Sequence, residues 1–184
     1  PEYSMNVVEV HDLMKAQRLV LLINLFHTLK LYWWEILTRR KRLRACFRRT
    51  PYLFRQMKRV VTRLHEANDY VFSVQIQSIF DASVEGVPHF VYTDHTHLAN
   101  LSYSGVTEED LFHRSWIDCE AEIYRNADRT FTMSSNIATS IVCDYGVSED
   151  QVLCIYSGTN SEVADFSESG MARDLNILFV GGDW

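Results

Sequence analysis

The sequence predicts an α/β fold, a Rossmann-like parallel sheet with helices on both faces. After residue 68, short apolar runs alternate with stretches of helical spacing, and this order is typical of strands joined by helices. The runs are apolar at consecutive positions, which indicates strands buried on both faces. With 47% hydrophobic residues in 184, the chain has enough apolar material for a packed core.

The first third of the chain predicts two helices. Apolar residues recur at roughly helical spacing through residues 8–37, which predicts one long helix there. A second helix is expected over residues 53–67, after Pro51 has set its start. The basic segment 39–49 lies between the two helices.

The rest of the chain predicts the sheet. Strands are expected at 70–74, 89–93, 129–133, 152–156 and 176–180, and helices at 108–126 and 136–145, the second of which ends at Gly146. In parallel sheets, ligands bind beyond the carboxyl ends of the strands. The residues directly after each strand are therefore the candidate site residues.

Several classes of protein are disfavoured by composition. The charged fraction is ordinary, and glycine and proline are too few for a disordered or low-complexity chain. The most apolar stretch, 19–37, contains Asn24, His27, Lys30 and Glu35, so it is a poor membrane span. The four widely spaced cysteines lack metal-ligand spacing and indicate reduced thiols in a cytoplasmic protein, with no metal and no cofactor.

The charge is distributed unevenly. Eleven of the 18 basic residues lie between Arg39 and Arg63, where no acidic residue occurs. This predicts a patch for an anionic surface, and its first members are Arg39, Arg40, Lys41, Arg42, Arg44, Arg48 and Arg49. The alternative is a solvated helix face. Nucleic acid is not the expected partner, because no recognition motif accompanies the charge and the remainder of the chain is acidic.

Polar residues follow two of the expected strands. The run Asp94-His95-Thr96-His97-Leu98-Ala99-Asn100 follows the strand HFVYT, and Ser134, Ser135 and Asn136 follow the next. The serines also suit a helix N-cap, and His97 and Asp94 could brace the loop that presents His95. For His95 itself, the alternative to a site role is a structural histidine bonded to a backbone carbonyl.

Three motifs in fixed order resemble the group 1 (family four) retaining glycosyltransferases, which have the GT-B fold. The motifs are PHFVYTDHT, ADRTFTMSSNIATSIVCDYGVSEDQVLCIYSGTN and NILFVGG, and the resemblance covers about residues 68–182. It implies an N-terminal acceptor-side domain over residues 1–160. Residues 161–184 would then be the linker and first strand of a truncated donor-binding domain.

The resemblance also implies roles for individual residues. His95 matches the family's catalytic histidine, which faces the donor sugar, and Gly181 and Gly182 match the turn that approaches the donor diphosphate. Substrate-binding roles are expected for Asp94, His97, Asn100, Ser134, Ser135 and Asn136. The partners are then a nucleotide-sugar donor and an unknown acceptor, with a lipid-linked acceptor fitting the basic segment at the inner face of a membrane.

Two other functions stay open. One is a non-catalytic Rossmann-like module that binds a membrane or a partner, and the other is a GT-B nucleotide-sugar epimerase. An apolar surface left by a missing half would favour a homodimer.

Overall fold

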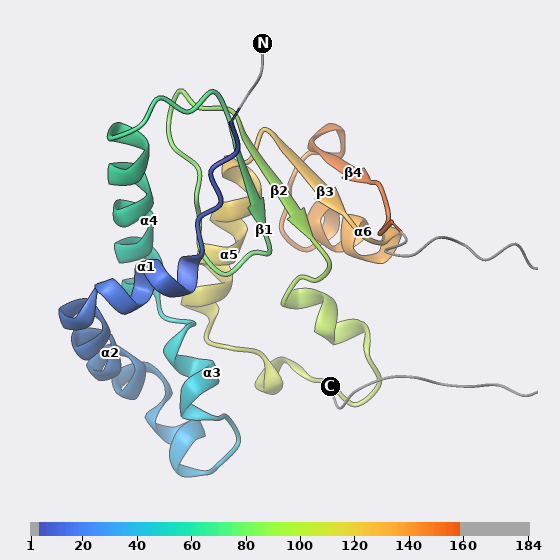
Figure 1. Cartoon of the computed structure of the whole chain (residues 1–184). Coiled ribbons are helices and arrows are strands. Elements are labelled where there is room, and N and C mark those ends of the chain that lie inside the picture. The colour runs from blue at the N-terminus through green and yellow to red at the C-terminus, as the bar shows by residue number, and fades with distance from the viewer. Residues whose placement is uncertain (1–3, 159–184) are drawn as a thin grey trace, which may run out of the picture.

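A parallel sheet forms the centre of the computed structural model, which describes residues 4–158. The strands are β1 (Ser73–Ile76), β2 (His89–Thr93), β3 (Arg129–Thr132) and β4 (Val152–Cys154), in the order β1-β2-β3-β4, and all neighbours are parallel (Figure 1). Helices flank the sheet. The predicted α/β, Rossmann-like class is confirmed.

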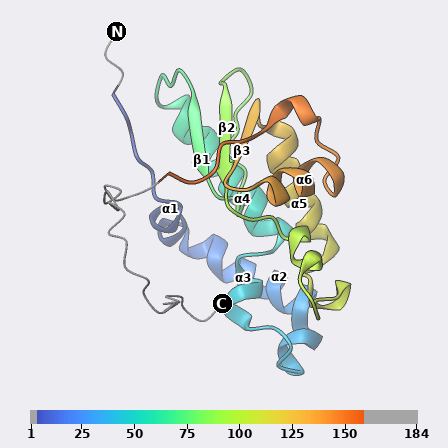
Figure 2. The ribbon, with the colours of Figure 1, turned by 90° about the vertical axis from the view of Figure 1, so that its right-hand side faces the viewer.

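Six α-helices occur in the described part of the chain. They are α1 (Val10–Ala16), α2 (Arg18–Leu37), α3 (Leu43–Phe47), α4 (Pro51–Glu66), α5 (Arg114–Asn126) and α6 (Ser135–Cys143). Short 3₁₀ turns are η1 (Leu98–Ser102), η2 (Glu108–Asp110) and η3 (Glu149–Gln151). In Figure 2, α5 and α6 lie together on one side of the strands.

Most of the predicted elements are confirmed, with shifted ends. The long helix predicted over 8–37 is two helices, because Gln17 leaves helical geometry between α1 and α2. The helix predicted over 108–126 begins only at Arg114, where the ring of His113 caps the first turn by accepting from the Ser115 amide. Strand β1 begins at Ser73, three residues after its predicted start. Its pairing with β2 begins only there, where the Ser73 amide donates to the Pro88 carbonyl. The strand predicted at 176–180 lies outside the described residues.

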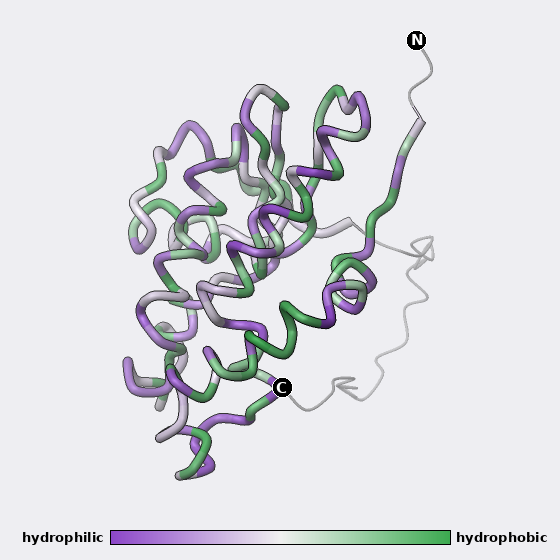
Figure 3. Tube along the Cα trace, turned by 90° about the vertical axis from the view of Figure 1, so that its left-hand side faces the viewer, coloured by the Kyte–Doolittle hydropathy of each residue, from purple (hydrophilic) through white to green (hydrophobic). Residues whose placement is uncertain are grey.

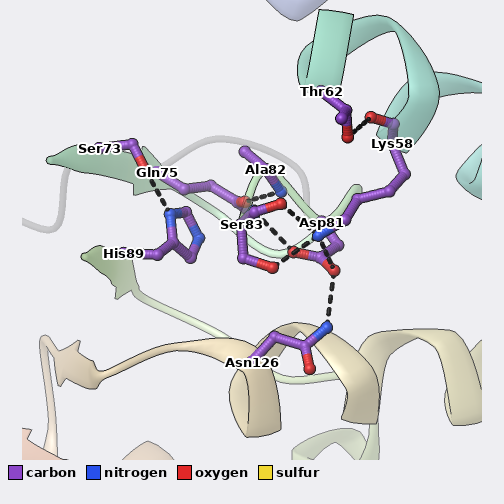
Figure 4. Close-up of polar contacts among 9 residues, drawn as sticks. All are labelled: Lys58, Thr62, Ser73, Gln75, Asp81, Ala82, Ser83, His89 and Asn126. Atoms are coloured by element: carbon purple, nitrogen blue, oxygen red, sulfur yellow. Dashed lines mark hydrogen bonds and ion pairs between the residues drawn. The ribbon is translucent and has the colours of Figure 1, made fainter. Parts of the chain in front are cut away.

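The connection from β1 to β2, residues 77–88, contains no α-helix. A cluster at the amino-terminal end of the strands holds it (Figure 4). The Lys58 ammonium lies 2.7 Å from an Asp81 carboxylate oxygen and also donates to the hydroxyl and carbonyl of Ser83. Asn126 on α5 donates to the same Asp81 oxygen at 2.8 Å. A partly buried ion pair thus fixes a connection that lacks helical hydrogen bonds.

The two faces of the sheet are covered unequally. Val91, Thr93, Thr130 and Thr132 are buried, whereas the alternate positions of the strands are partly or fully exposed. The exposed strand side chains of this second face include Val74, Ile76 and Leu153. Because side chains alternate along a strand, the core lies on one side of the sheet.

Helix α2 has its polar side chains on the inside. Asn24, Thr28 and Tyr32 are fully buried, and their hydrogen bonds go to backbone carbonyls of Phe47, Asn24 and Arg49 respectively. The outward side carries large apolar residues, and the α2 tube is mostly green in Figure 3. These exposed residues are Leu19, Leu22, Ile23, Leu25, Phe26, Leu29, Trp33, Trp34 and Leu37. A helix of this kind presents an apolar stripe to its surroundings.

Candidate functional site

A cavity of about 120 Å³ lies at the carboxyl ends of β1 and β2. Its lining comes from four parts of the chain: the residue before α4, the residues after β1, the residues after β2, and α5. The lining residues are Arg49, Gln77, Ser78, Ile79, Thr93, Asp94, His95, His97, Trp116 and Glu120. The parallel strands bring these loops together, because neighbouring strands end at the same edge of the sheet.

His95 and Asp94 are two lining residues whose side chains make no hydrogen bond within residues 4–158. His95 is half-buried and its ring makes no hydrogen bond with any residue of the described chain, while its backbone carbonyl accepts from the Thr93 hydroxyl at 2.8 Å. Asp94 is exposed. Both are placed where a ligand would meet them. The alternative was a structural histidine bonded to a backbone carbonyl. The His95 ring makes no such hydrogen bond among residues 4–158.

His97 lies in the same cavity but braces the loop. Its Nε2 accepts from the Phe112 amide at 2.8 Å, and its backbone amide donates to Glu120. Burial lowers the pKa of His97 to about 4, and the nearby Arg49 and His95 act in the same direction. The ring is therefore neutral at pH 7, with Nε2 as an acceptor. Asn100, a predicted binding residue, donates back to the His97 carbonyl at 2.8 Å and does not line the cavity.

Glu120 is the buried carboxyl at the base of the cavity, and the sequence analysis missed it. It accepts from the Tyr145 hydroxyl, the His97 amide and, at 3.3 Å, the Ser78 hydroxyl. Burial raises the pKa of Glu120 to about 7, and these hydrogen bonds oppose the rise. A signal was available, because Glu120 shares the helical spacing of the buried Trp116 and Tyr124.

Arg49 was predicted as part of the basic surface patch, and the structure places it in the cavity instead. Its guanidinium carbon lies 4.3 Å from the ring centre of Phe112 and 5.3 Å from that of Trp116. Lys41 also turns inward, and its ammonium donates to the Leu111 carbonyl at 2.7 Å. Arg39, Arg40, Arg42 and Arg44 remain exposed, and Arg48 is half-buried.

The predicted residues after β3 lie at the same edge of the sheet but outside this cavity. The Met133 amide donates to the Thr93 carbonyl at 3.2 Å, so the loops after β2 and β3 are adjacent. Ser134 caps α6, since its hydroxyl accepts from the Ile137 amide at 3.4 Å, and Ser135 and Asn136 are exposed at the first turn. Gly181 and Gly182 lie outside the described residues, as does the predicted segment 161–184.

Two further observations bear on the predicted partners. Among residues 4–158, no group of three or more histidine, cysteine, aspartate or glutamate side chains is arranged to hold a metal ion. Within the same residues, none of the helices combines the length and apolar character needed to cross a bilayer. All four cysteines lie in the described part and are free thiols there.

The chain has no match among known proteins in three comparisons. No protein-family model, no curated protein and no solved structure matches it.

Proposed function

We propose that this chain is the N-terminal, acceptor-side part of a retaining glycosyltransferase with the GT-B fold, which transfers a sugar from a nucleotide-sugar donor to an acceptor. The observation that carries the proposal is the position of His95. Its ring, without a hydrogen-bond partner in residues 4–158, lines a cavity at the carboxyl edge of a parallel sheet. The reaction class is what the resemblance of the three sequence motifs implies.

The chemistry of sugar transfer fits the groups in the cavity. The bond between the anomeric carbon and the donor phosphate breaks, and a new bond forms to an acceptor oxygen. Positive charge develops on the sugar and negative charge on the departing phosphate. In this proposal His95 and Asp94 face the sugar, Glu120 and His97 hold their loop in place, and the glycine turn at Gly181 and Gly182 meets the diphosphate.

The test is transfer by the full-length protein from UDP-, GDP- and ADP-linked hexoses, compared with its His95→Ala variant. We expect the parent to release nucleotide diphosphate from one donor, and we expect His95→Ala to lower kcat/KM by about 100-fold through loss of positioning. His11→Ala is the matched control, since His11 is exposed and far along the chain from the cavity. Equal rates for His95→Ala and the control would remove the proposed role of His95.

A second candidate function, attachment to an anionic membrane surface, is favoured by α2. Its outward stripe includes Phe26 and Trp33, which are 67% and 57% exposed. The exposed Arg42 and Arg44 follow in the next segment of the chain. Apolar side chains beside cations suit the boundary between lipid headgroups and acyl chains, where each cation contributes about 1 kcal/mol near an anionic leaflet. This function is compatible with a glycosyltransferase that uses a lipid-linked acceptor. It does not depend on the glycosyltransferase proposal.

Co-sedimentation with vesicles tests the membrane proposal. We expect the protein to bind vesicles that contain phosphatidylserine more strongly than neutral phosphatidylcholine vesicles. The double variant Phe26→Ser, Trp33→Ser should lose binding to both, and Arg42→Ser, Arg44→Ser should lose the preference for anionic lipid. Arg59→Ser on the exposed side of α4 is the control. If none of the variants alters binding, or the parent binds neither vesicle, α2 has no such role.

A further inference from the structure

Arg49 has hydrogen-bonding capacity that the described protein does not use. Its guanidinium makes one side-chain hydrogen bond in residues 4–158, from a terminal nitrogen to the Ala45 carbonyl at 3.2 Å. Its Nε is buried without a partner there, and Arg49 takes part in none of the ion pairs of the described chain. A guanidinium offers several N–H donors in a planar fork, and leaving them unpaired in a buried place is costly.

The rings of Phe112 and Trp116 fix this guanidinium in the cavity. They lie 4.3 and 5.3 Å from its carbon, and such stacking orients the fork. Trp116 is 3% exposed, and its indole N–H is also buried without a partner among residues 4–158. Both residues line the cavity, and each has one buried donor without an acceptor among residues 4–158.

The nearby carboxyl groups do not take up these donors. Glu120 already accepts hydrogen bonds from Tyr145, His97 and Ser78, and it does not come within ion-pair distance of Arg49. Asp94 is exposed at the rim. The donor capacity of Arg49 and Trp116 is thus left for a ligand oxygen.

We infer that Arg49 and Trp116 bind an anionic oxygen group, a phosphate or a carboxylate, carried by the acceptor substrate. The size of the cavity favours a single small group, because about 120 Å³ is well below the roughly 300 to 1,000 Å³ of typical ligand pockets. The assignment to the acceptor depends on the proposed function, whereas the anion site itself does not.

Nuclear magnetic resonance of the full-length protein tests the site, with the Trp116 indole N–H as the reporter, assigned by its loss in Trp116→Phe. The probes are inorganic phosphate and acetate, with chloride at matched ionic strength as the reference. We expect a saturable shift of this resonance with phosphate, with acetate or with both, and the probe that acts identifies the group. No saturable shift with either would overturn the inference.

Substitutions then locate the cation. Arg49→Met should weaken the saturable binding by about tenfold or more, and Arg49→Lys should weaken it less, because lysine keeps the charge but loses the fork. Arg44→Met, on the exposed surface, should leave it unchanged. If Arg49→Met perturbs folding, Arg49→Lys alone decides, and parental affinity in that variant would overturn the assignment.

These measurements are independent of sugar transfer. If His95→Ala keeps full transfer activity while Arg49→Met loses phosphate binding, the role proposed for His95 fails and the anion site stands. If phosphate binding is indifferent to Arg49, the anion site fails and the transferase proposal is untouched.

Discussion

The two ends of the sheet differ in how their partly buried cations are paired. At the amino-terminal end, the Lys58 ammonium is bonded to Asp81 and to both oxygens of Ser83, and Asp81 also accepts from Asn126 and the Ser83 amide. At the carboxyl end, Arg49 has one carbonyl as acceptor in the described chain, and the His95 ring has no partner there. The Lys58 ammonium is paired within the protein, whereas Arg49 keeps a buried Nε without a partner among residues 4–158.

This difference separates structural polar clusters from binding sites. A polar group that is buried and fully paired contributes to folding, because removal of a partner leaves a desolvated charge. A buried donor without a partner lowers stability, and a ligand can recover the lost interactions. We propose the cavity of Arg49 and His95 as the functional end, although Lys58 and Asp81 are equally reactive residues.

The largest expected effect is that of Lys58→Met on stability. The substitution leaves the Asp81 carboxylate, which is 3% exposed at its side chain, without its cation, and such a loss costs about 3 to 5 kcal/mol of unfolding free energy. Urea unfolding at pH 7 measures it. Arg59→Met, one residue along α4 and exposed, is the control and should change the free energy by less than about 0.5 kcal/mol.

The double variant Lys58→Met, Asp81→Leu sharpens this test. It removes both charges, so it should recover part of the stability that Lys58→Met loses. A Lys58→Met protein as stable as the Arg59→Met control would contradict the structural role given to this end of the sheet.

The next largest effect is a pH-dependent change in the free energy of unfolding, caused by Glu120. Its pKa in the folded protein is about 7, above the ordinary value of 4.5. Between these pH values the unfolded chain has lost the proton and the folded chain retains it, so Glu120 lowers stability as the pH rises. Glu120→Gln does not titrate. The unfolding free energy of Glu120→Gln minus that of the parent should therefore increase by up to about 3 kcal/mol from pH 4.5 to pH 7.

The measurement is urea unfolding of both proteins at several pH values. Burial lowers the pKa values of His89 and His97 to about 4, and these groups raise stability with pH over an overlapping window. Because both proteins share them, they largely cancel in the difference. A difference that stays constant from pH 4.5 to 7 would show that Glu120 titrates normally.

The smallest effect is expected at Thr50, which supports the segment that presents Arg49. Its hydroxyl bonds to the Asn24 side chain and accepts from the Leu53 amide at 3.1 Å, as the N-cap of α4. Thr50→Ala should lower the free energy of unfolding by about 1 to 2 kcal/mol. Thermal unfolding measures the loss, and Thr38→Ala, at the exposed end of α2, is the matched control. Equal melting temperatures would mean that this cap contributes nothing.

The sequence predicted the strand-end position of His95 because that depends on local pattern. HFVYT is a short apolar run after Gly86 and Pro88, and it forms β2 over the predicted residues. The parallel pairing then follows from alternating strands and helices. The outcome for Asn100 was less predictable, because the chain turns back into η1 and the amide bonds the His97 carbonyl.

Arg49 shows why the rest of the site was missed. It lies in a run of like charges, and no local pattern distinguishes it from Arg48 or Arg44. Its place is set by Phe112 and Trp116, more than 60 residues away in sequence. The inverted polarity of α2 is likewise a tertiary effect, since Asn24 and Tyr32 face the protein to bond the carbonyls of Phe47 and Arg49.

The contrast between the two ends is tested most directly by measuring kcat/KM for sugar transfer and the melting temperature of His95→Ala and Asp81→Asn in the full-length protein. We predict that His95→Ala lowers kcat/KM by about 100-fold at an unchanged melting temperature. Asp81→Asn should lower the melting temperature and leave kcat/KM of the folded protein close to the parent value. Full activity in His95→Ala, or lost activity in a stable Asp81→Asn protein, would contradict the assignment of the functional end.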